Sequence, residues 1–127
     1  MLKAIFTPVV CTIALLTGIS AFAQQKPAKP GTKEAFAEQM EQEMVIGMVA
    51  LRDTCKERNP ADAARIDANW KTQAADMPAS TAAFIRTGEF KKKITARKQE
   101  QAEEAKSDAG AKMLQGMCTQ MAAPAAN

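Results

Sequence analysis

Apolar side chains recur at steps of three and four residues between Lys33 and Glu57, which is the period of a helix with one buried face. The members of this stripe are Phe36, Met40, Met44, Met48, Leu51 and Cys55. Glutamates lie in the first half of the segment and basic residues in its last turns, so the charges complement the helix dipole. The pattern predicts a first helix from Lys33 to about Glu57, with the stripe in the core.

A second helix is predicted from Asn59 to Met77. Asn59 offers a side-chain oxygen as N-cap, and Pro60 suits the first helical position, where a backbone N–H has no partner anyway. Pro78 ends the helix, because the residue before a proline avoids the helical conformation. The apolar stripe of this helix consists of Ala63, Ile66, Trp70, Ala74 and Met77.

A third helix is predicted with Ser80 as its cap. Its apolar residues occupy only the first half, and residues 95–108 are polar on nearly every side. A straight helix of this length rises about 40 Å and would extend past the first helix, so that a hairpin projects from the bundle. A kink at Gly88 would fold the helix back and remove the projection. The sequence leaves both arrangements open.

A fourth, shorter helix is predicted after Ser107, Asp108 and Gly110. Its apolar stripe consists of Met113, Leu114, Met117, Cys118 and Met121. No strand-like alternation competes with the helical pattern, so the fold class is all-α. We expect a small antiparallel bundle of four helices, in its extended form a helical hairpin. This single domain covers residues 33–122, and a disordered tail covers residues 123–127.

The first 23 residues predict a cleaved secretory signal peptide. Lys3 precedes an apolar run over residues 4–19, and Ala21 and Ala23 supply the small side chains that signal peptidase requires. We therefore expect no stable membrane anchor after cleavage. Residues 24–32 are rich in proline and lysine and predict a flexible linker. The expected destination is the periplasm or the exterior.

Cys55 and Cys118 are the two cysteines that remain after this processing. An even number in an exported chain favours a disulfide, which would close a loop of roughly 60 residues. The predicted helix lengths agree with this disulfide. If the third helix extends past the first, a fourth helix that descends from its end reaches the level of Cys55 after about a dozen residues, within a turn of Cys118. Redox catalysis is disfavoured because the Cys-x-x-Cys spacing is absent.

Composition argues against an enzyme. The chain has no histidine and no tyrosine, and Ser80 and Ser107 are the serines beyond the predicted signal peptide. The usual pairs of nucleophile and base therefore cannot be assembled, and no cofactor is expected. Acidic and basic residues are mixed along a chain of net charge +3, which predicts no nucleic-acid surface.

Methionine spacing suggests a partner-binding surface. The last helix is expected to extend past the first, which leaves an adaptable apolar patch for an unidentified protein partner or a second copy of the chain. The residues of this patch are Met113, Leu114, Met117 and Met121. The sequence thus predicts an exported, non-catalytic, protein-binding or chaperone-like periplasmic factor.

A soft-metal-binding protein is the alternative. Met40, Met44 and Met48 follow one another at four-residue steps, which would present three thioethers on one helical face to Cu(I) or Ag(I). Core packing is the simpler interpretation of this spacing, because methionine fills irregular gaps in helical cores.

Overall fold

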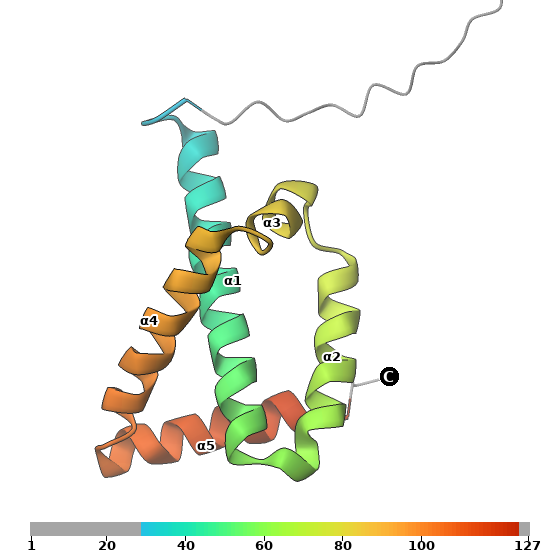
Figure 1. The fold of residues 1–127 in the computed structure, drawn as a ribbon, viewed down its shortest axis with the longest axis vertical. Coiled ribbons are helices and arrows are strands. Elements are labelled where there is room, and N and C mark those ends of the chain that lie inside the picture. The colour runs from blue at the N-terminus through green and yellow to red at the C-terminus, as the bar shows by residue number, and fades with distance from the viewer. Residues whose placement is uncertain (1–28, 125–127) are drawn as a thin grey trace, which may run out of the picture.

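The computed structural model describes residues 29–124, which form five α-helices and one short 3₁₀-helix (Figure 1). The α-helices are α1 (Lys33–Arg58), α2 (Ala63–Ala75), α3 (Ala79–Phe84), α4 (Gly88–Glu104) and α5 (Asp108–Ala122). This part of the chain contains no strand, so the prediction of an all-α fold is confirmed. None of its helices is long and apolar enough to cross a lipid bilayer.

Several predicted segments lie outside the described residues. These are the signal peptide over residues 1–23, residues 24–28 of the linker and residues 125–127 of the tail. The end of the linker forms a turn into α1, in which the Thr32 hydroxyl oxygen accepts a hydrogen bond from the backbone N–H of Ala35 (3.2 Å). This cap fixes the start of α1 where the apolar pattern predicts it.

The long helix α1 is the axis of the fold. Its 26 residues span about 39 Å, twice the length of the 13-residue α2. The helices α2 and α4 flank α1, α3 lies across the upper end of the space beside it, and α5 crosses its lower end (Figure 1). All four contact α1. The crossing course of α5 differs from the antiparallel course expected for the last helix.

The predicted third helix is divided into α3 and α4. The Thr87 hydroxyl donates to the carbonyl oxygen of Phe84 (2.7 Å) and accepts from the backbone N–H of Phe90 (3.1 Å), so one side chain ends α3 and caps α4. The two phenylalanine rings meet edge to face, with centroids 5.4 Å apart. The break next to Gly88 lets α4 descend beside α1, so of the two arrangements that the sequence leaves open the kinked one forms and the projecting hairpin does not.

Two predicted caps are wrong. The Asn59 side chain makes no capping hydrogen bond, and the 3₁₀-helix Pro60–Asp62 precedes α2 instead. Ser80 lies inside α3, which begins directly after Pro78. In both places a proline already fixes the backbone geometry at the start of the helix, so the side-chain cap is not needed.

The corner between α4 and α5 is tightly closed. The Ser107 hydroxyl oxygen accepts from the backbone N–H of Gly110 (3.0 Å) and so caps α5. A β-carbon at Gly110 would collide with the backbone carbonyl of Glu104, so this position requires glycine. The close approach turns the chain sharply and directs α5 beneath α1 (Figure 1).

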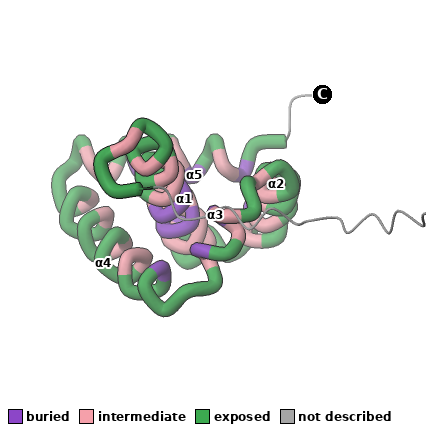
Figure 2. Tube along the Cα trace, turned by 90° about the horizontal axis from the view of Figure 1, so that it is seen from above, coloured by how far each residue is buried: buried purple, intermediate pink, exposed green. Residues whose placement is uncertain are grey.

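The buried side chains form two clusters. The upper cluster consists of Val45, Ile46, Val49, Phe84 and Phe90. The lower cluster consists of Cys55, Ile66, Leu114, Cys118 and Ala122. Among the described helices α1 alone contributes buried residues to both, and its middle turns form the most buried part of the trace in Figure 2.

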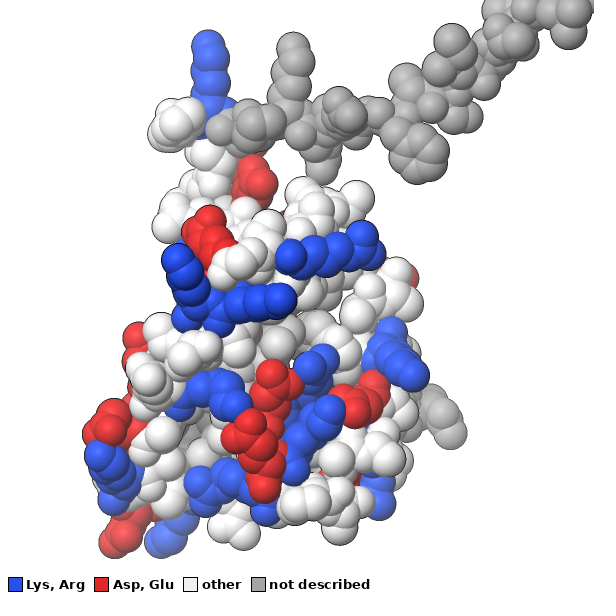
Figure 3. All heavy atoms as spheres, in the orientation of Figure 1, with Lys and Arg blue, Asp and Glu red and all other residues white. Residues whose placement is uncertain are grey.

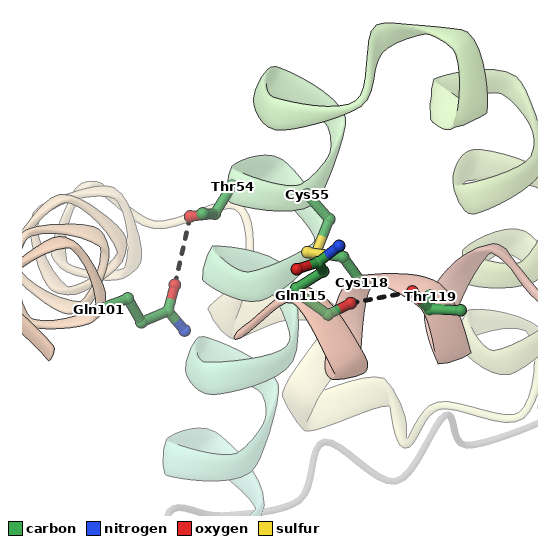
Figure 4. Close-up of a disulfide and its surroundings, with 6 residues drawn as sticks. All are labelled: Thr54, Cys55, Gln101, Gln115, Cys118 and Thr119. Atoms are coloured by element: carbon green, nitrogen blue, oxygen red, sulfur yellow. Dashed lines mark hydrogen bonds between the residues drawn. A yellow bond between two sulfur atoms is a disulfide. The ribbon is translucent and has the colours of Figure 1, made fainter. Parts of the chain in front are cut away.

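The predicted disulfide between Cys55 and Cys118 is present in the lower cluster. It joins the last turns of α1 to α5 across a sequence separation of 63, with the Cα atoms 5.2 Å apart (Figure 4). Both cysteines are almost inaccessible, at 0% and 3% exposure. Beside them the Thr54 hydroxyl donates to the side-chain oxygen of Gln101 (3.2 Å), which ties α4 to the same end of α1. The bond is placed for structure and not for thiol exchange.

Replacing Cys55 and Cys118 together with alanine is expected to lower the free energy of unfolding by about 4 kcal/mol, because the unfolded chain regains the freedom of the closed loop. Urea denaturation followed by circular dichroism measures the change. The wild type, reduced while unfolded, should unfold at the same urea concentration as the variant. Equal midpoints for the oxidised wild type and the variant would contradict the structural role of the bond.

Candidate functional site

The structure separates the residues predicted as a partner-binding patch on α5. Leu114 is 4% exposed and belongs to the lower cluster, so it cannot contact a partner in this fold. Met117 and Met121 are half-buried against the same cluster. Met113 alone is well exposed, at 58%. Leu114, Met117 and Met121 pack in the cluster that holds the disulfide, and a single exposed methionine does not make a patch.

Exposed apolar side chains gather on α1 instead. Phe36, Met40 and Met44 are 65, 57 and 62% exposed, and four-residue spacing places them along one side of the helix. We term these three residues the α1 stripe. The prediction that they lie in the core is therefore wrong. The buried positions of α1 are Val45, Ile46, Val49, Ala50 and Cys55.

The length of α1 explains this exposure. Its first turns extend above α3 and the start of α4, where no described helix covers them (Figure 1). A step of four residues also exceeds the 3.6 residues of a helical turn, so the stripe drifts around the helix by about 40° per step. It approaches the buried face only at the half-buried Met48.

The α1 stripe continues into a groove between α1, α2 and α3, with a volume of about 380 Å³. At its mouth the Thr81 hydroxyl donates to the carboxylate of Glu41 (3.3 Å). We term this the methionine groove. Its apolar walls come from Met44, Val45, Met48, Trp70, Met77 and Pro78.

Carboxylates are frequent on the first half of α1, and two of them, Glu41 and Asp76, line the methionine groove. The first half of α1 carries four glutamates and one lysine, and Asp76 adds a carboxylate at the groove. Glu43 pairs with Lys93 of α4 (3.4 Å). Within residues 29–124 the other three glutamates of this half of α1 have no ion-pair partner. They are Glu34, Glu38 and Glu41.

Trp70 and Met77 also line a second groove, on the side of α2 that faces α4. This groove has a volume of about 500 Å³, and cationic side chains stand along it. The guanidinium of Arg52 lies over the Trp70 ring, 5.3 Å from its centroid, and donates to the carboxylate of Asp53 (2.8 Å). We term it the arginine groove. The cations along it are Arg52, Arg86 and Lys91.

An ion pair holds α1 and α2 together on the side of their connecting turn. The ammonium group of Lys56 donates to both carboxylate oxygens of Asp67, at 2.8 and 2.7 Å. These hydrogen bonds lower the pKa of Asp67 below its ordinary value of 3.8, and the positive charges of Lys56, Arg52 and Lys71 act in the same direction. The pair is partly exposed, so salt screens it.

Charges of both signs are mixed on one face of the described protein, and its cysteine and carboxylate side chains form no metal site. On the face shown in Figure 3, basic and acidic side chains are interspersed. From Lys29 to Pro124 no group of three or more His, Cys, Asp or Glu side chains is placed to hold a metal ion. No model of a known protein family, no curated protein and no solved structure matches the chain. Function is therefore inferred from the α1 stripe and the two grooves.

Sequence periodicity misses both grooves. It assigns Trp70 to the buried face of α2 and does not indicate that this side chain borders both of these grooves. One signal for the exposed surface does exist, because the predicted first helix is much longer than its neighbour and part of it must remain uncovered. The grooves depend on interhelical distances, which the sequence pattern does not contain.

Replacing Asp67 with asparagine is expected to lower the melting temperature at pH 7 and to have little effect near pH 2. The folded state lowers the pKa of Asp67, so its contribution is present above the ordinary pKa and is lost as the pH falls through the lowered value. Thermal melts across this range measure the difference between variant and wild type.

Asp76→Asn removes the same charge from an exposed residue at the end of the same helix and serves as the control. The difference in melting temperature between Asp76→Asn and the wild type should not change with pH in the way that is expected for Asp67→Asn. A pH-independent effect of Asp67→Asn would show that the ion pair does not act through the carboxylate charge.

Proposed function

We propose that the protein is an exported, non-catalytic factor that binds an amphipathic, positively charged segment of another protein. The α1 stripe and the methionine groove form the binding surface. The exposure of Phe36, Met40 and Met44, each above half, carries this proposal. Apolar side chains that are exposed together and lead into a groove mark interaction sites on proteins of this size.

Methionine suits a surface that accepts more than one sequence. Its unbranched side chain and polarisable sulfur adapt to partners of different shape. A partner helix laid along α1 would place apolar residues at four-residue steps against the α1 stripe, with one anchor in the methionine groove. Such adaptable recognition supports a chaperone-like role.

Charge selects the partner. The carboxylates of Glu41 and Asp76 line the methionine groove without an ion-pair partner in the described part of the chain. With Glu34 and Glu38 elsewhere on α1, they favour a segment whose polar face carries lysine or arginine. They disfavour a second copy of the chain in the same place, because two identical acidic surfaces would face each other. The occupant we infer is therefore a cationic amphipathic segment of a different protein.

Two features support a periplasmic or secreted location. Residues 1–23 carry the charge, apolar run and small residues of a signal peptide. The buried disulfide between Cys55 and Cys118 is of the kind that persists in oxidising compartments. Both fit a factor that meets its partner after export.

A fluorescent amphipathic peptide of leucine and lysine tests the proposal by anisotropy titration. The double variant Met40→Gln, Met44→Gln is expected to bind it at least tenfold more weakly, because burying these side chains contributes about 1.5 kcal/mol or more each. Met113→Gln is the matched control, since Met113 is equally exposed but lies on α5. It should leave the affinity unchanged.

A peptide in which glutamate replaces lysine examines the charge argument. It is expected to bind at least tenfold more weakly than the leucine and lysine peptide. Thermal melts of the double variant should stay close to those of the wild type, because substitutions of exposed residues change stability little. An equal loss for Met113→Gln, or equal binding of the acidic peptide, would rule out this surface.

The same exposure favours a second candidate function, the binding of a soft metal ion. Met40 and Met44 are not used in the core, and Met48 follows on the same side of α1. Thioethers are suitable ligands for Cu(I) or Ag(I).

Replacing Met40, Met44 and Met48 with leucine removes the thioethers and keeps the apolar surface. For a metal carrier, titration with Cu(I) against a competing chelator should show binding that this variant loses and Met113→Leu retains. The same triple variant should still bind the leucine and lysine peptide if protein binding is the function. Cu(I) binding that is equal in wild type and triple variant would eliminate the metal site.

A further inference from the structure

We propose that the arginine groove binds a single-chain amphiphile with an anionic head group, such as a long-chain carboxylate. The tail would lie along the apolar walls of the groove and the head among its cations. This ligand site is distinct from the methionine groove and does not depend on the function proposed for it.

The shape and lining of the groove fit a small amphiphile. Its volume of about 500 Å³ lies within the usual range for small-molecule sites. Four helices contribute to this open groove, so an occupant would contact several elements of the fold. The apolar walls come from Val49, Trp70, Met77, Ile85, Phe90 and Ile94.

The distribution of ion pairs points to an anionic head. Between residues 86 and 98 the chain carries six basic side chains and one glutamate. Lys93, Arg97 and Lys98 each pair with a carboxylate. Arg86 and Lys91 line the groove and have no ion-pair partner within the described chain.

The third cation is held in place by its neighbours. Arg52 is kept over the Trp70 ring and against the carboxylate of Asp53, which is the acidic residue of this groove. A single carboxylate that is already paired leaves the lining with net positive charge. The two grooves that Trp70 borders therefore differ in the sign of their charge, with carboxylates at the methionine groove and cations along the arginine groove.

Trp70 makes the site directly measurable, because it is the single tryptophan of the chain. Laurate, titrated below its micelle concentration, is expected to shift the Trp70 emission with a saturable curve. In the Met40→Gln, Met44→Gln variant, which weakens the methionine groove that Trp70 also lines, dodecyltrimethylammonium, with the same chain length and opposite charge, should bind at least tenfold more weakly than laurate. Acetate, which has the head without the tail, should produce no shift.

The double variant Arg86→Gln, Lys91→Gln is expected to weaken laurate binding at least tenfold. Lys92→Gln, Lys112→Gln removes the same charge from exposed residues outside the groove and is the matched control, with unchanged affinity. Met40→Gln, Met44→Gln should also leave laurate binding unchanged, so failure of the peptide-binding proposal and failure of this one can be told apart.

Three results would overturn the proposal. These are equal binding of the cationic amphiphile, an equal loss in the Lys92 and Lys112 control, and a Trp70 response to phosphatidylglycerol vesicles without any response to monomeric laurate. The last result would indicate a membrane-surface contact in place of a binding site for single amphiphile molecules. A saturable Trp70 response to laurate that is lost in the double variant Arg86→Gln, Lys91→Gln and kept in both controls would establish the amphiphile site.

Discussion

The disulfide between Cys55 and Cys118 holds α5 across the end of α1, and the lower cluster is assembled around it. The Asn69 side chain adds to this closure, because its amide donates to the carbonyl oxygens of Met121 and Ala123 (both 2.8 Å) and fixes the end of α5 against α2. The upper cluster has no covalent link. A domain of this size buries only a modest core, so a bond that restricts the unfolded chain supplies stability that packing alone does not.

The division of the core into two clusters also explains where open surface remains. One long helix passes through both clusters, while shorter helices cover different parts of it. The uncovered first turns of α1 expose Phe36 and Met40, and the space beside Trp70 stays incompletely filled. Both candidate binding regions thus follow from a mismatch of helix lengths and not from any added loop or insertion.

Much of the fold follows from the sequence by simple rules. The period of apolar residues and the capping and proline positions predict α1, α2 and the last helix within a few residues. The cysteine count predicts the disulfide, whereas the helix-length argument for it is wrong, because it assumes an unbroken third helix that extends past α1. The break between α3 and α4 is one of two arrangements that the sequence leaves open. Thr87 can cap a new helix, but the neighbouring residues also favour one continuous helix. The contact between the rings of Phe84 and Phe90 decides the outcome.

The candidate site was harder to predict. Periodicity identifies an apolar face but not whether another helix covers it, so the exposed Phe36, Met40 and Met44 looked like core. The sequence predicts Leu114 and Met117 at the surface because a last helix that extends beyond α1 would expose them, whereas the corner at Gly110 directs α5 beneath α1. That corner has a consequence for maturation. A side chain at position 110 would collide with the last turn of α4 and shift the start of α5, so the path that brings Cys118 to Cys55 depends on a residue that has no sulfur and no side chain.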